Sequence, residues 1–84
     1  MAYVKLIQHD VLKERHELTS LLRRDMANMK IAYGGNIDYY KGRMMGIINA
    51  YNAMGIIGTY ARMRYINIIN NASFKRWAEV SVYE

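Results

Sequence analysis

The feature that most constrains this chain is a run of forty residues, from Tyr39 to Ala78, that contains no aspartate or glutamate. Beginning just before this run, apolar or small residues recur at alternating steps of three and four, which is the spacing of one helix face. This stripe comprises Ile37, Tyr40, Met44, Ile47, Tyr51, Met54, Gly58, Ala61, Tyr65, Ile68 and Ala72. The pattern predicts one long and largely apolar helix.

The part of the chain before this run is also expected to be helical. Proline is absent and 52% of the residues are hydrophobic, a composition that suits helices rather than loops or disorder. A first helix is predicted over about 10–33, with Asp10 as its N-cap. Gly34 begins a turn over 34–36, because glycine adopts the left-handed conformation at little cost. For residues 1–9, helix, strand and extended arm all remain open.

The second half completes the predicted fold. The long helix is expected over about 37–70, and the sequence leaves open whether it bends at Gly55 and Gly58. A short helix follows over about 74–80. The chain is therefore expected to be one all-α domain over 1–84, an antiparallel helical hairpin with a long second helix and a short C-terminal helix.

Small size and apolar excess predict self-association. An 84-residue chain buries a modest share of its surface, so small folds commonly depend on disulfides, metals or oligomerisation. Cysteine is absent, which excludes disulfides and thiolate metal sites. Small side chains at Gly42, Gly46, Ala50 and Ala53 give the long helix a second contact face. We expect a homo-oligomeric bundle, most simply a dimer. Its predicted interface comprises Met44, Gly46, Ile47, Ala50, Tyr51, Met54, Gly58 and Ala61.

The net charge of +5 is unevenly distributed. Residues 39–78 hold six basic side chains and no acid, whereas residues 1–38 hold six basic and five acidic ones. A local basic surplus attracts polyanions, so a nucleic-acid or nucleotide-binding module is an alternative function. The other interpretation is a solvated face, or pairing with acids of the first helix. The candidate anion-binding residues are Lys41, Arg43, Arg62, Arg64, Lys75 and Arg76.

A second alternative is a small membrane protein that spans the bilayer at residues 44–61. These eighteen residues carry no charge and reach the lower limit of length for a transmembrane helix. Asn49 and Asn52 near the middle argue against this alternative, because polar amides are costly in hydrocarbon. In a helix bundle the same asparagines would fix the register of packed helices.

The sequence contains no recognisable catalytic or metal-binding motif. His9 and His16 are seven residues apart, whereas helical metal sites use ligands three or four residues apart. Ser20, Ser73 and Ser81 lie in no nucleophile motif, and the glycines form no phosphate-binding loop. We therefore expect no enzyme activity, no cofactor and no metal.

These observations lead to one functional expectation. The protein is expected to be a cytoplasmic, non-enzymatic, self-associating helical protein that acts by binding another protein, as an adaptor, inhibitor or assembly component. A compact accessory protein of a phage or mobile element would have this character. The identity of its partner and the order of its oligomer are not encoded in any motif.

Overall fold

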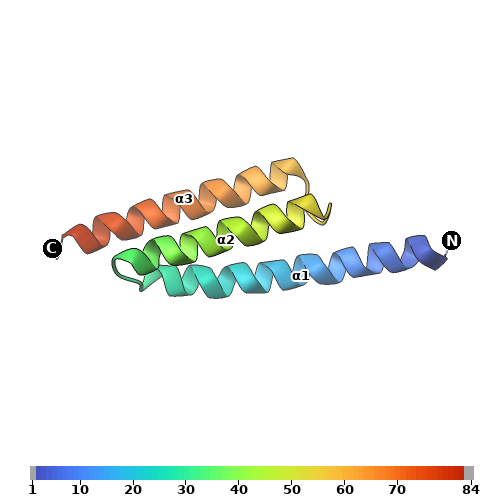
Figure 1. The fold of residues 1–84 in the computed structure, drawn as a ribbon, viewed down its shortest axis with the longest axis horizontal. Helices are drawn as coiled ribbons and strands as arrows, with labels where there is room; N and C mark the ends of the chain where they lie inside the picture. Colours follow the sequence, from blue (N-terminus) through green and yellow to red (C-terminus); the bar gives the residue numbers. More distant parts are fainter. Residues whose placement is uncertain (1, 83–84) are drawn as a thin grey trace.

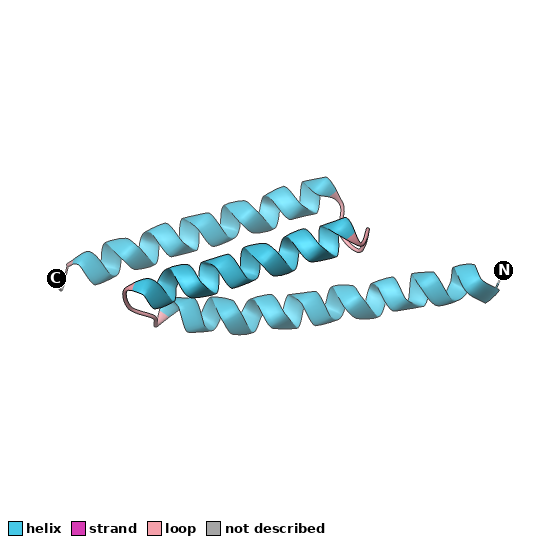
Figure 2. Cartoon of the chain, in the orientation of Figure 1, coloured by secondary structure: helices cyan, strands magenta, loops and turns pink. Residues whose placement is uncertain are grey.

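The computed structural model describes the backbone of residues 2–82 and the side chains of residues 11–82. The structure is all-helical, as predicted, with α1 (Ala2–Lys30), α2 (Gly35–Ala53) and α3 (Thr59–Ser81). The three helices run up, down and up, and α2 packs against both α1 and α3 (Figures 1 and 2). The expected close packing of the first two helices as a hairpin is confirmed.

The long helix expected over residues 37–70 is interrupted at the glycines where a bend was left open, because the chain reverses at residues 54–58. Gly55 has a φ of +77°, a conformation that ends a helix at low cost only for glycine. The amide of Gly55 donates to the Asn52 carbonyl, and that of Ile56 donates to the Tyr51 carbonyl. This pair of bonds is a Schellman motif, which satisfies the last carbonyls of α2.

The boundaries of the other elements also differ from expectation. Gly34 has the predicted positive φ of +57°, but α1 already ends at Lys30 and α2 begins at Gly35. Because α1 starts at Ala2, Asp10 is not its N-cap. The short helix predicted over 74–80 is the end of α3 rather than a separate element.

The core is a thin layer along α2. Leu18 and Met29 of α1, Met44 and Ile48 of α2, and Ile69 of α3 are almost completely buried. Each such side chain contributes roughly 1.5 to 3 kcal/mol through removal of apolar surface from water. The α2–α3 link adds to the core as well, since Ile56 and Ile57 are buried.

The molecule is elongated, with extents of 59 × 20 × 14 Å. Its radius of gyration is 15.3 Å, against about 12 Å for a compact domain of this length. The second helix, expected to be long, is the shortest of the three. The start of α1 projects past the α2–α3 link, and the end of α3 projects past the α1–α2 link (Figure 1).

The uncharged window over 44–61 is divided between the end of α2, the link and the start of α3. Among the residues that the structure describes, no helix has the length and apolarity needed to cross a membrane. The structure therefore lacks the single helix over residues 44–61 that the membrane alternative requires.

Candidate protein-binding surfaces

The predicted oligomer interface is divided between the core and the surface. Met44 is fully buried within the chain, so it has no exposed surface to contribute to an interface between copies. It belongs to the hydrophobic core of the chain. Ile47, Tyr51 and Ala61 are partly buried and pack against the same core. The exposed members of the predicted set are Gly46, Ala50, Met54 and Gly58.

The outer face of α2 carries the small residues that the sequence singled out. Gly42, Gly46, Ala50 and Ala53 are exposed. A Cβ atom added at Gly42 or Gly46 would have no neighbouring atom within 4 Å. Packing within the chain therefore does not require glycine at these two positions.

Three of the six predicted anion-binding residues donate hydrogen bonds to other groups of the same chain. Arg62 donates through Nε to Oδ1 of Asn49 at 2.8 Å, which ties α3 to α2. Arg76 donates through Nε to the Ala32 carbonyl at 2.9 Å, and its guanidinium lies 4.7 Å from the centroid of the Tyr33 ring. These contacts fix the positions of two cations that an extended phosphate track would need.

Arg43 is the third of these engaged cations. Its Nε donates to Oδ2 of Asp25 at 2.9 Å, and the Asp25 side chain is only 4% exposed. A hydrogen bond with the Tyr39 side chain and the charge of Asp25 raise the pKa of Arg43. The pair links α2 to α1 and supplies the buried carboxylate with its partner.

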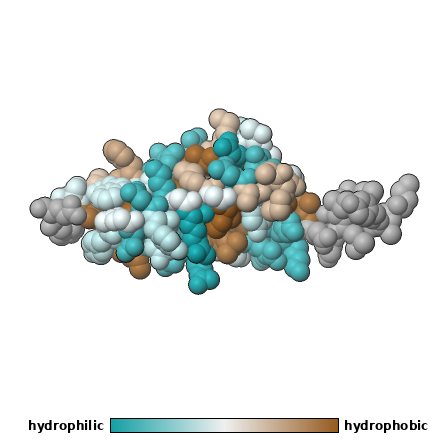
Figure 3. Space-filling view, viewed as in Figure 1, coloured by the Kyte–Doolittle hydropathy of each residue, from teal (hydrophilic) through white to brown (hydrophobic). Residues whose placement is uncertain are grey.

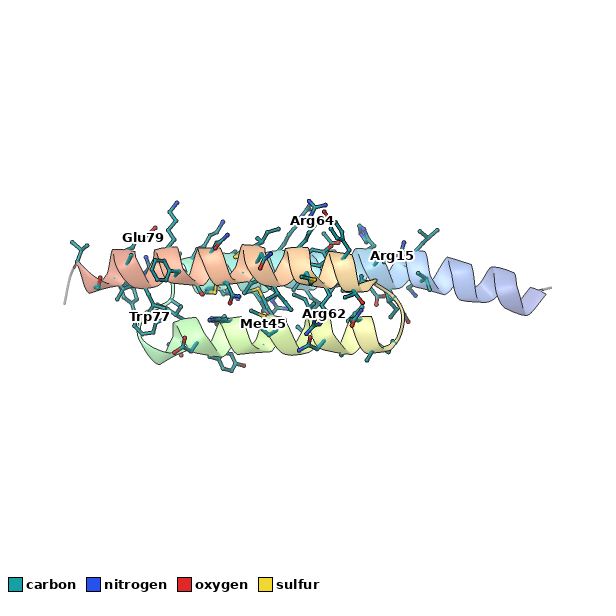
Figure 4. The ribbon with its side chains drawn as sticks, turned by 90° about the horizontal axis from the view of Figure 1, so that it is seen from above. Arg15, Met45, Arg62, Arg64, Trp77 and Glu79 are labelled. Atoms are coloured by element: carbon teal, nitrogen blue, oxygen red, sulfur yellow. The ribbon has the colours of Figure 1, made fainter. Side chains whose placement is uncertain are left out.

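The remaining predicted cations are Lys41, which is half-buried, and Arg64 and Lys75, which are exposed on α3. Arg64 projects from the side of α3 that faces away from α2, whereas Trp77 and Met45 lie between these two helices (Figure 4). Trp77 donates through Nε1 to Oδ1 of Asp38 at 3.3 Å. The six predicted anion-binding residues therefore do not form one continuous basic surface. This arrangement weakens the alternative of a nucleic-acid-binding protein.

A groove follows the seam between α1 and α3, which contact each other far less than either contacts α2. Three adjoining hollows of about 330, 400 and 360 Å³ form it. The first two share Thr19 and Tyr65, and the last two share Lys30, so they follow one another along the seam. The central hollow is lined mainly by Leu22, Met26, Ala27, Tyr65, Ile68 and Ile69.

Sequence reasoning missed this groove and its basic residues on α1. Arg23 and Lys30 line the central hollow, and Arg15 lines the first. They escaped notice because the charge of residues 1–38 is nearly balanced overall. A signal was present, since Thr19, Arg23, Met26 and Lys30 recur at steps of three and four beside the buried stripe of α1.

A second unpartnered surface is the outer face of α3. Tyr60, Met63, Phe74 and the following Val82 are 77%, 55%, 79% and 80% exposed. Together with Asn67, Asn71 and Ala78 they recur at steps of three and four, so they share one face. On the side of the molecule seen in Figure 3, hydrophobic surface lies in separate patches among hydrophilic ones.

The candidates for catalysis and metal binding are not brought together. Ser73 and Ser81 donate to the carbonyls of Asn70 and Ala78 within α3, and His16 is exposed on α1. The side chain of His9 lies outside the described residues. In the described part of the chain, no group of three His, Cys, Asp or Glu residues could hold a metal ion.

Comparison with known proteins finds no matching family model, no similar curated protein and no similar solved structure.

Proposed function

We propose that this protein is non-enzymatic and acts by protein–protein binding, beginning with the association of two copies through the outer face of α3. The observation that supports the proposal is the row of exposed apolar side chains on that face. Tyr60, Met63 and Phe74 are each more than half exposed. Tyr60 and Met63 form one apolar patch on this face and Phe74 and Val82 form another, with Asn67 and Asn71 between them. Exposed apolar patches of this kind commonly mark interaction sites.

The order of residues along this face suits a twofold antiparallel pair. Asn71 lies midway between Tyr60 and Val82. When two α3 helices cross at Asn71, Tyr60 of one copy lies opposite Val82 of the other, and the two Asn71 amides meet on the axis. A single amide pair at such a position fixes register and orientation, and an interface of this kind is isologous.

Charge predicts how this association responds to salt. Each copy carries a net charge of +5, and Arg64 and Lys75 flank the proposed interface. The two copies therefore repel each other. Salt at 0.1 M largely screens exposed charges that are more than about 10 Å apart. The dimer should therefore become tighter as the salt concentration rises.

Light scattering at tens of micromolar tests the proposal. The wild-type protein is expected at twice the chain mass of 9.8 kDa, and Phe74→Glu is expected at the chain mass. Leu12→Glu is the matched control, because Leu12 is 65% exposed on α1. A wild-type protein that remains at 9.8 kDa, or a Phe74→Glu variant that still dimerises, would contradict the proposal.

A further inference from the structure

We infer that the groove between α1 and α3 binds an acidic amphipathic helix of another protein. The inference deepens the proposed binding function but uses a different surface from the outer face of α3. The first support is shape. Two helices that diverge on one side of α2 leave a seam that a fourth antiparallel or parallel helix can fill, as in a four-helix bundle.

The dimensions of the groove fit a helix of about four turns. Its three hollows contact α1 from Arg15 to Lys30. At about 1.5 Å per residue this distance is about 23 Å. The central hollow has a volume of about 400 Å³, which is room for several large side chains and too much for a single one.

The floor of the groove favours apolar side chains. Leu22 and Ile69 form the bottom and are 8% and 2% exposed, while Met26, Ala27 and Ile68 form the walls. A helix with apolar residues at steps of three and four would place them against these walls. Nucleic acid fits such a floor poorly, because its phosphates need polar partners along their whole path.

The rim of the groove specifies the charge of the occupant. Arg23 and Lys30 border it on α1, and Lys75 borders it on α3. Arg64 projects from α3 just outside Tyr65 and Ile68, on the side away from α2 (Figure 4).

The acids of the described residues are almost all elsewhere. Glu79 alone lines the groove, and it is paired with Arg76 at 3.2 Å. Glu14 and Glu17 line none of the hollows, Asp25 is buried against Arg43, and Asp38 accepts from Trp77. A basic rim around an apolar floor is complementary to a helix with acidic flanks. A second copy of this basic chain is a poor match for it.

Selection from a displayed library of 18-residue helical peptides tests the inference. Apolar residues are fixed at steps of three and four, and all other positions are random. The wild-type protein should enrich peptides with Asp and Glu beside the apolar positions. Ala27→Glu, which changes an exposed residue of the groove wall, should not. The inference is overturned if no peptide is enriched, or if the enriched peptides are neutral or basic.

Fluorescence anisotropy with the best selected peptide then measures the role of the rim. Arg23→Glu with Lys30→Glu should weaken binding about tenfold or more, and rising salt should weaken it too. Lys13→Glu with Arg24→Glu, two exposed changes that line no hollow and alter the net charge by the same amount, is the matched control and should leave the affinity within about twofold. Equal weakening by the control, or displacement of the peptide by duplex DNA, would overturn the inference.

The two proposals can fail separately. Phe74→Glu should abolish dimerisation and leave peptide binding intact, while Ala27→Glu should do the opposite. Salt should tighten the dimer and weaken the peptide complex. Peptide-bound protein that loses its dimeric mass would show instead that a second copy occupies the groove.

Discussion

Asp25 is a buried acid on the face of α1 that otherwise carries apolar side chains. It is 3% exposed and lies between the buried residues Leu22 and Met29. A carboxylate in such a place requires a partner, because an unpaired buried charge is far more costly than a buried apolar group. Arg43 provides that partner from α2, so the pair fixes the register of the hairpin.

The pair predicts an asymmetric response to mutation. Arg43→Met should lower the midpoint of urea unfolding, because it leaves the Asp25 carboxylate buried without a partner. The double variant Asp25→Leu with Arg43→Met should return the midpoint to the wild-type value or above, since an apolar pair costs no charge desolvation. Arg24→Met, at an exposed position of α1, is the control. A double variant as unstable as Arg43→Met would contradict this account.

At the scale of the elements, the reversal between α2 and α3 depends on Gly55. With φ at +77°, Gly55→Ala should lower the free energy of unfolding by about 1 to 2 kcal/mol, because other L-residues are strained in this region. Gly46 lies inside α2, and a Cβ atom added there would have no neighbour within 4 Å. Gly46→Ala should therefore raise the free energy of unfolding by about 0.5 to 1 kcal/mol. Urea unfolding of both variants measures the contrast. If Gly46→Ala instead weakened self-association, the small face of α2 would be an interface.

The α2–α3 link should behave as part of the core. Ile56 is 3% exposed, and its carbonyl accepts from Nε of Arg15 at 2.7 Å. Ile56→Ala should therefore cost about 2 to 5 kcal/mol, the range for removal of a large buried side chain. Ile31→Ala in the other link, where Ile31 is 71% exposed, should change stability by less than about 0.5 kcal/mol. Equal effects at the two links, measured by thermal unfolding, would show that the α2–α3 link is not packed.

The helical stripe predicted part of these elements correctly. Ile37 and Met44 lie on the buried face of α2, and Ala61, Tyr65 and Ile68 line the groove. What the period could not reveal is the break, because Met54 and Gly58 keep the spacing of three and four across a reversal of direction. The local signal was a glycine followed by an apolar residue, Gly55 and Ile56, which is the end of a Schellman motif.

At the scale of the whole molecule, the proposed dimer predicts that stability depends on protein concentration. The melting temperature of the wild-type protein should rise by about 3 to 5 °C for each tenfold increase in concentration, because dimerisation adds free energy only to the folded state. Phe74→Glu should melt at the same temperature at every concentration. Differential scanning calorimetry across a dilution series provides the measurement. A wild-type melting temperature that does not change with dilution would contradict self-association.

The all-α class and the hairpin could be predicted from composition and periodicity, whereas the proposed binding groove could not. The groove depends on which side of α1 faces α3, and this is decided by long-range contacts such as Arg76 with the Ala32 carbonyl. Likewise, a count of charges by sequence segment could not reveal the basic rim of the groove. Arg23 and Lys30 come from one helix and Lys75 from another, and only packing brings them to the same edge.

The odd number of antiparallel helices has a mechanical consequence. Since α1 begins at one end of the molecule and α3 finishes at the other (Figure 1), the protein is a rod with one attachment point at each tip. Whatever is joined ahead of α1 and after α3 is held apart by most of the 59 Å long axis. Fluorophores attached at the two tips should therefore report the straightness of this rod directly, through the efficiency of energy transfer between them.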